Sequence, residues 1–71
     1  MNIYTTPGSK VIFAHPTWGY DHDIYQASKY LVHNAIYTVD RCEPHACDTD
    51  VYLTQFPNIP FNSVQFDNLP E

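Results

Sequence analysis

The segment CEPHAC, residues 42–47, holds the densest group of potential metal ligands in the sequence. Thiolates and imidazole are good zinc ligands, so Cys42, His45 and Cys47 could supply three of the four ligands of a structural zinc site, with Asp48 or a distant histidine as the fourth. Against this, the C-x2-H-x-C spacing is not a common zinc pattern, and most such modules have two clusters. We therefore expect no cofactor and keep a small zinc-binding module as the alternative hypothesis.

The same two cysteines could instead form a disulfide. The N-terminal segment MNIYTTPGSK has neither the charged n-region nor the apolar h-region of a secretory signal, which indicates a cytoplasmic protein. Thiols stay reduced in that compartment. We therefore expect one free thiol on a loop and one small, partly buried cysteine.

The segment HPTWGYDHD contains groups that could act as a general acid and base, namely His15, Asp21, His22 and Asp23. Catalytic groups need a concave, largely preformed pocket, and a domain this small rarely has one. The sequence also lacks a nucleophile elbow, a phosphate-binding glycine loop and a metalloprotease helix motif. We therefore predict that the protein is not an enzyme.

Aromatic and acidic residues in the same region favour a surface that binds another protein. Trp and Tyr are frequent hot-spot residues of interfaces, and an acidic surface speeds association with a basic partner. A purely structural alternative is that two of the rings cover an open end of the fold. The predicted partner-binding residues are Trp18, Tyr20, Asp21, Asp23 and Tyr25.

The chain has 71 residues and a formal charge of −5, with only three Lys or Arg residues. Because no cationic stripe can neutralise phosphates, direct binding to nucleic acid or to anionic membranes is disfavoured. No apolar run approaches the ~20 residues that a membrane-spanning helix needs. The length predicts one small domain, residues 1–71, and a domain near this size buries only ~60% of the surface that its unfolded chain exposes. A homodimer would relieve this small core and stays open.

Six Tyr, four Phe and one Trp favour a folded, β-rich domain, because rings bury a large area per residue. Runs of β-branched and aromatic residues predict strands at residues 10–15, 35–41, 50–56 and 62–66. Apolar residues at helical spacing predict a short helix that starts near Asp21, is capped by Asp21 or Asp23, and ends near residues 33–34. Its predicted apolar stripe is Ile24, Ala27, Tyr30 and Leu31.

The segment TDVYLTQFPNIPFNSVQF, residues 49–66, closes the predicted core. Pro57 and Pro60 lack the N–H that a sheet ladder needs, so a bend or a single helical turn is expected between the last two strands. Val64 and Phe66 should share one face of the last strand, and Phe61 should be buried. These elements predict a mainly β fold, a small, strongly bent antiparallel barrel of the SH3-like kind with one short helix after the first strand. An open antiparallel α+β sheet is the alternative.

The elements PGSKVIF, IYTV and DVYLTQFPNIPFNSVQF resemble those of a group of short bacterial and phage proteins. In that group a glycine-led KV.F strand opens the chain, YTV follows the helix, and a V.L..FP...FNSV.F segment closes it. The resemblance implies an SH3-like barrel and a phage or mobile-element origin, and it transfers no functional residue. The resulting hypothesis is a non-enzymatic interaction module that binds and modulates, or inhibits, a host or defence protein.

Overall fold

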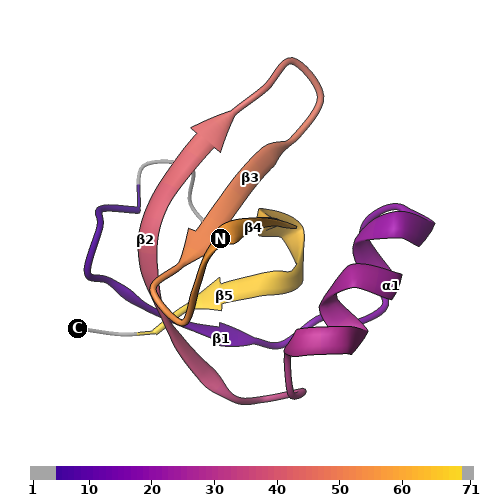
Figure 1. Ribbon diagram of the computed structural model, residues 1–71, viewed down its shortest axis with the longest axis horizontal. Helices are drawn as coiled ribbons and strands as arrows, with labels where there is room; N and C mark the ends of the chain where they lie inside the picture. Colours follow the sequence, from indigo (N-terminus) through magenta and orange to yellow (C-terminus); the bar gives the residue numbers. More distant parts are fainter. Residues whose placement is uncertain (1–4, 70–71) are drawn as a thin grey trace.

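A computed structural model of the chain describes residues 5–69 and shows a mainly β fold with one α-helix (Figure 1). The fold class predicted from the sequence, including a short helix after the first strand, is confirmed. In chain order the elements are β1 (Lys10–Phe13), α1 (Asp21–Tyr30), β2 (Ile36–Pro44), β3 (Thr49–Leu53), β4 (Phe56–Asn62), the 3-10 helix η1 (Ser63–Gln65) and β5 (Phe66–Asn68).

The strands form one antiparallel sheet in the order β4-β3-β2-β1-β5, so β4 and β5 lie at its edges. Among residues 5–69 no strand pairing joins these two edges, and the barrel that we expected is therefore not closed. The open antiparallel sheet, our alternative, describes it better. The sheet is nevertheless bent, and Asp40 is an extra residue in β2 between the pairs Val39–Leu53 and Arg41–Tyr52. Such a bulge increases the local twist of a strand.

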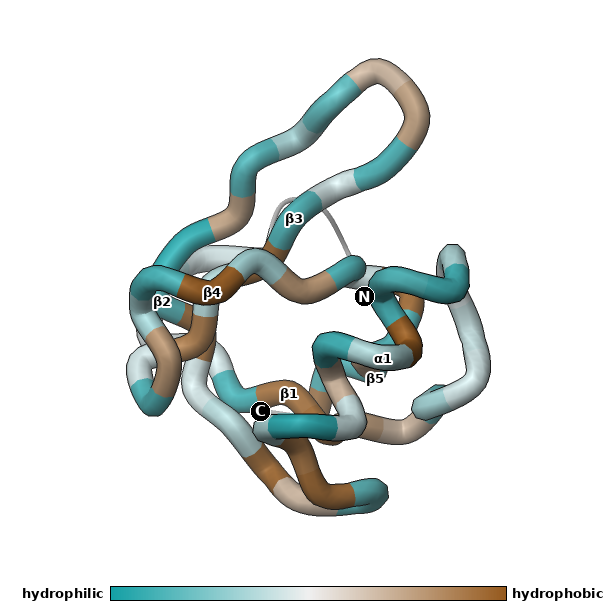
Figure 2. Tube along the Cα trace, turned by 45° about the vertical axis from the view of Figure 1, so that its right-hand side comes forward, coloured by the Kyte–Doolittle hydropathy of each residue, from teal (hydrophilic) through white to brown (hydrophobic). Residues whose placement is uncertain are grey.

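Side chains alternate between core and solvent along the strands, as the two-residue period requires. In β1, Val11 and Phe13 are buried, whereas Lys10 is exposed. Figure 2 shows hydrophobic residues recurring along β1 and β4. The remaining buried hydrophobic residues of the described chain are Ala27, Leu31, Tyr37, Val39, Val51, Leu53, Phe61 and Phe66.

The proline-containing segment FPNIPF is part of strand β4, so the bend or helical turn that we expected there is wrong. Two features make the prolines compatible with a strand. First, β4 is an edge strand, where a missing N–H on the outer side disrupts no ladder. Second, the pairing passes from Leu53–Phe56 to Val51–Phe61, so that residues 57–60 stand opposite Tyr52 alone. The prolines also remove donors from this edge, which hinders pairing with another chain.

The segment after β4 also differs from the prediction. Instead of a continuous strand it begins with η1, because the side-chain Oδ1 of Asn62 accepts a hydrogen bond from the backbone N–H of Val64 at 3.2 Å. Asparagine is a favoured cap for such a turn. Val64 is consequently exposed while Phe66 is fully buried, and the prediction that they share one face is wrong.

Helix α1 begins where the sequence predicted and is capped by Asp23, whose Oδ2 accepts a hydrogen bond from the backbone N–H of Tyr20 at 2.9 Å. It ends at Tyr30, earlier than we expected, and Asn34 then adopts the left-handed conformation, with φ 68°. The helix lies beside β4, where the Nε2 of Gln26 donates to the backbone oxygen of Pro60 at 2.7 Å. This contact holds α1 against the end of β4.

Candidate functional site

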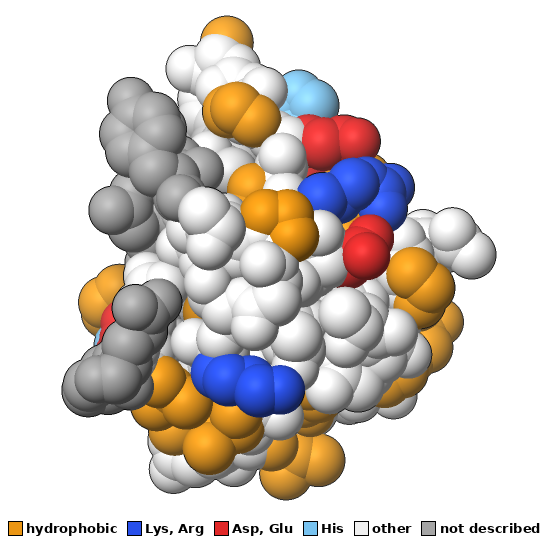
Figure 3. Space-filling model, turned by 90° about the vertical axis from the view of Figure 1, so that its left-hand side faces the viewer, with side chains coloured by type: hydrophobic (Ala, Val, Ile, Leu, Met, Phe, Trp, Pro, Cys, Tyr) orange, Lys and Arg blue, Asp and Glu red, His pale blue; other side chains and the backbone are white. Residues whose placement is uncertain are grey.

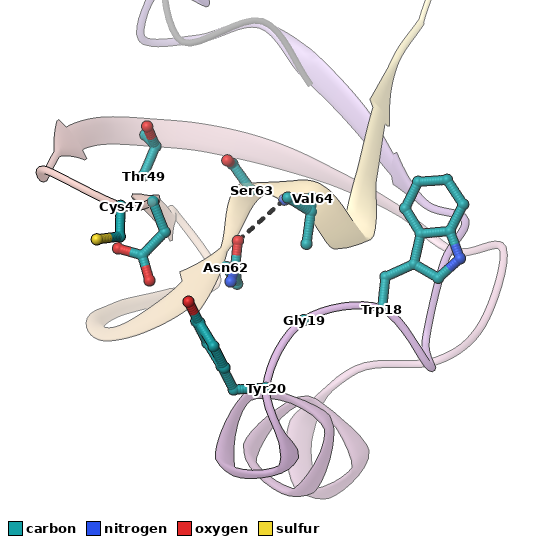
Figure 4. A pocket seen from close by; sticks show the side chains of 9 residues that line it. Trp18, Gly19, Tyr20, Cys47, Thr49, Asn62, Ser63 and Val64 are labelled. Carbon is teal, nitrogen blue, oxygen red and sulfur yellow. Dashed lines mark hydrogen bonds between the residues drawn. The ribbon is translucent and has the colours of Figure 1, made fainter.

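A pocket of about 640 Å³ lies where three segments meet that are far apart in the sequence (Figure 4). One wall is the loop that precedes α1, a second is the tip of the β2–β3 hairpin, and the third is formed by the end of β4 with η1. Ligand pockets in proteins usually measure ~300–1,000 Å³, so the size is adequate for side chains of a partner. The lining residues are Trp18, Gly19, Tyr20, Cys47, Asp48, Thr49, Asn62, Ser63 and Val64.

Two half-exposed aromatic rings stand at opposite ends of this pocket. Figure 4 shows Tyr20 reaching toward Cys47 and Thr49, whereas Trp18 lies beyond Val64 at the other end. Their exposed fractions are 55% for Tyr20 and 54% for Trp18. Both rings therefore keep a large apolar area available to a partner.

The indole of Trp18 is held from outside the pocket. The ring of His15 stacks on it with a centroid distance of 3.7 Å and an angle of 8° between the planes. His15 is fixed in turn, because its Nε2 lies 3.0 Å from Oδ1 of Asp67 and its backbone N–H donates to the oxygen of Gln65. Strands β1 and β5 thus position the loop that carries Trp18.

A chain of hydrogen bonds crosses the floor of the pocket. Besides capping the helix at Tyr20, the Oδ2 of Asp23 accepts a bond from Nδ2 of Asn62 at 2.9 Å. Asn62 then caps η1 through the N–H of Val64. The partly buried carboxylate of Asp23 therefore joins the loop and the helix to β4, and through Asn62 to η1.

Gly19, between the two rings, has a φ of +93°, a region that L-residues rarely adopt. A Cβ at this position would lie 3.0 Å from Oδ2 and 3.2 Å from Cβ of Asp23. Gly8 has nearly the same φ, +91°, but a Cβ there would meet nothing within 4 Å. A comparison of the same substitution at the two glycines therefore separates the effect of backbone strain from the effect of crowding by Asp23.

We expect Gly8→Ala to lower the free energy of unfolding by about 1–2 kcal/mol, the penalty of the left-handed conformation alone. Gly19→Ala should lower it further, because the added methyl group also displaces the Asp23 carboxylate. Urea denaturation of both variants measures the difference. Equal losses would show that the crowding at Gly19 has no energetic effect.

The two strands of the hairpin approach each other more closely in the sequence than the predicted strands 35–41 and 50–56, so the connecting loop is shorter than expected. Strand β2 continues to Pro44, which pairs with Thr49. The backbone N–H of His45 donates to the oxygen of Asp48 at 2.7 Å and closes the turn. The ring of His45 lies 3.0 Å from Oδ2 of Asp50.

A family model described as Bacteriophage T4 protein Y07B matches residues 2–71. The chain belongs to this family. The phage connection inferred from the resemblance is thereby confirmed, while the SH3-like type and the distinctive closing motif stay predictions. No curated protein and no solved structure matches the chain. Within the described residues, no helix has the length and apolar character that a membrane crossing requires.

The five residues predicted to bind a partner occupy different environments in this Y07B-family chain. Trp18 and Tyr20 line the pocket, whereas Asp23 lies beneath it as a structural group. Asp21 and Tyr25 lie on the exposed surface of α1 and do not line the pocket, and Lys29 covers the Tyr25 ring at 4.4 Å from its centroid. The structure therefore brings two of the five together.

The sequence analysis missed the other seven lining residues, which are Gly19 between the two rings and six residues from the hairpin tip and the β4–η1 junction. The residue Asn62 carried a usable signal, since an asparagine before a short turn is a capping residue. For Cys47 and Asp48 the sequence signal pointed to metal binding instead. Their role as a pocket wall depends on contacts between distant segments.

The proposed zinc ligands do not come together in the Y07B-family chain. His45 pairs with Asp50, while the Sγ of Cys42 contacts the backbone oxygen of Thr5 at 4.0 Å. Burial raises the pKa of the Cys42 thiol, which disfavours the thiolate that a metal needs. Among residues 5–69 no three side chains are placed to hold a metal ion. The zinc alternative is therefore not supported by the geometry.

Both cysteines are free thiols, Cys42 partly buried and Cys47 exposed, as expected. Of the acid–base candidates in HPTWGYDHD, the structure brings together only His22 and Asp23. His15 pairs with Asp67, whereas the ring of His22 lies 3.3 Å from Asp23 at the start of the helix. His15 is therefore held away from the His22–Asp23 pair by its own partner, Asp67.

All three Lys and Arg side chains of this Y07B-family chain contact other groups, and none lines the pocket. Lys10 bonds Thr38, and Lys29 lies over Tyr25. Arg41 forms ion pairs with neighbouring carboxylates, at 2.9 Å from Asp40 and 3.4 Å from Glu43. On the face shown in Figure 3 the basic side chains lie apart and form no continuous stripe.

Proposed function

We propose that this phage protein is a non-enzymatic interaction module that binds and modulates, by inhibition, a host or defence protein in the cytoplasm of the bacterial cell. The observation that carries the proposal is the pocket with Trp18 and Tyr20 half-exposed at its two ends. Isolated exposed rings are common, but two rings around one concavity are typical of a binding site.

The way in which the rings are held also supports binding. Interface side chains that are already ordered lose less conformational freedom when the partner arrives. Trp18 is ordered by its stack on His15, and the backbone at Tyr20 is fixed by Asp23. Much of the ordering is therefore complete before the partner binds.

The SH3-like character belongs to the same proposal. SH3 domains accept extended segments in aromatic-lined grooves, and here the loop after β1 supplies the rings. The pocket lies between a loop and a hairpin tip and is open to solvent, so an extended segment of a partner protein is a ligand that could fit it.

Affinity capture from the host, with variants of the rings, tests the proposal. We expect Trp18→Ala and Tyr20→Ala each to weaken partner binding by about tenfold or more, as for interface hot spots. Tyr25→Ala should leave binding unchanged, although Tyr25 is the more exposed ring at 65%. Surface binding measurements on the captured partner give the affinities, and circular dichroism checks that each variant is folded.

The Tyr25→Ala control distinguishes binding at the pocket from binding at the exposed face of α1. Loss of binding in Tyr25→Ala with retention in Trp18→Ala would move the site to the exposed face of α1. Unchanged affinity in all three variants would contradict a site at either place.

A further inference from the structure

The two ends of the pocket differ in chemistry. At one end Trp18 and the exposed side chain of Val64 offer apolar surface. At the other end Tyr20 faces the hairpin tip, which carries the carboxylate of Asp48. A ligand that fills the whole pocket must therefore satisfy an apolar end and an acidic end at once.

Asp48 is the acidic residue among the lining side chains, and no Lys or Arg accompanies it there. Within residues 5–69 its carboxylate has no ion pair or side-chain hydrogen bond, in contrast to Asp40, Asp50 and Asp67, which all have a charged or ionisable partner. Asp48 is also half-buried, so its charge is less screened than that of a fully exposed group. Together with the net charge of −5, this carboxylate disfavours an acidic ligand and favours a cationic one.

We infer that the pocket binds a segment of the partner protein that combines a basic and an apolar side chain. The Lys or Arg side chain would lie at the Tyr20–Asp48 end, and the apolar side chain would pack on Trp18 and Val64. The inference rests on the proposed function and specifies the ligand of the same site.

Each end supplies a recognised interaction for its side chain. A cation beside Asp48 gains a charge-assisted hydrogen bond, and a cation over the face of the Tyr20 ring gains a cation–π contact. This chain already pairs cations with tyrosine rings, since Arg41 lies 3.9 Å from the centroid of Tyr52. Arginine suits the acidic end better than lysine, because its planar guanidinium group can stack on a ring and hydrogen-bond a carboxylate at the same time.

Selection from a displayed library of random peptides tests the inference with defined probes. The full chain is used as bait, and Trp18→Ala serves as the counter-selection bait. We expect the peptides that depend on Trp18 to be enriched in Arg or Lys accompanied by an apolar residue. Pocket-dependent peptides without a basic residue would overturn the inference while leaving the proposed function intact. No peptide enriched over the Trp18→Ala bait would overturn both.

Fluorescence titration then measures the acidic end directly, because Trp18 is the single tryptophan of the chain. A selected peptide should bind Asp48→Asn about tenfold more weakly than the original protein, and the same peptide with Arg replaced by Gln should lose a similar factor. Asp40→Asn is the matched control, since Asp40 pairs with Arg41 outside the pocket, and it should bind normally. Equal affinity of Asp48→Asn and Asp40→Asn would overturn the inference.

A second copy of this chain is the competing occupant of the pocket. The molecular mass in solution, measured at the concentration used for the selection, decides between the two. A monomer is expected for the original protein and for Trp18→Ala. A dimer that disappears in Trp18→Ala would show that the pocket is an interface between copies and would overturn the inference.

Discussion

Replacing Phe61 with alanine is expected to unfold most of the protein at 37 °C. Phe61 is only 2% exposed, and its ring lies 6.3 Å from that of Phe56 and 6.4 Å from that of Phe66, centroid to centroid. Removing such a ring lowers the free energy of unfolding by about 3–5 kcal/mol. A single core of this size rarely supplies more than ~3–5 kcal/mol, so little stability remains. Thermal denaturation followed by circular dichroism measures the loss.

Tyr30→Ala provides the control for Phe61→Ala. The Tyr30 ring belongs to the same aromatic cluster, 6.4 Å from Phe61, but 42% of the residue is exposed. Its removal leaves a smaller void, and we expect a melting temperature between those of the original protein and Phe61→Ala. A Phe61→Ala protein with unchanged thermal stability would contradict the buried position of this ring.

Replacing Asp23 with alanine is expected to lower the free energy of unfolding by about 2–3 kcal/mol. The variant loses two hydrogen bonds to a charged group, each of which contributes about 1.5–3 kcal/mol in favourable cases and less where water can replace it. Asn62 is only 3% exposed, so its Nδ2 would be left buried without its acceptor. The favourable charge at the start of α1 is also removed. Urea denaturation measures the stability, and Trp18 fluorescence reports the state of the loop.

Asp21→Ala measures how much a negative charge at the start of α1 contributes to stability, apart from the hydrogen bonds that Asp23 makes. Asp21 lies in the same first turn and is exposed. Its removal should lower the free energy of unfolding by about 0.3–1 kcal/mol, the contribution of an acidic group near a helix N-terminus. Equal losses in both variants would indicate that the bonds to Tyr20 and Asn62 add nothing to stability.

The elements of the fold were predictable where the pattern of nearby residues decides the structure. The alternation around Val11 and Phe13 predicted the observed strand. The helical spacing of Ile24 and Ala27 predicted the observed helix, which ends one residue before Leu31. Strand β4 was missed, because a proline argues against a strand only when the strand lies inside a sheet. Whether the segment is an edge depends on the strand order, which local sequence does not contain.

The candidate site was predictable only in part. Trp18 and Tyr20 were found because Trp and Tyr are frequent hot-spot residues of interfaces and lie here in a loop with acidic residues. Asp23 was correctly expected as a possible cap, but its bond to Asn62 joins positions 39 residues apart and leaves no local signal. The metal hypothesis for Cys42 and His45 depended on ligand types that lie close together in the sequence, and the spacing already argued against it. In the hairpin these side chains have different partners, Thr5 and Asp50.

The sequence by itself determined the β-rich class, the helix start near Asp21 and the absence of a cationic stripe. Periodicity, capping and composition act over a few residues, so they can be inferred from the residues themselves. Only the tertiary structure decided that the sheet stays open and that residues 18–20, 47–49 and 62–64 enclose one pocket. The strand order places these segments side by side, and the burial of Phe61 holds the end of β4 against the core. Both depend on the packing of the whole chain.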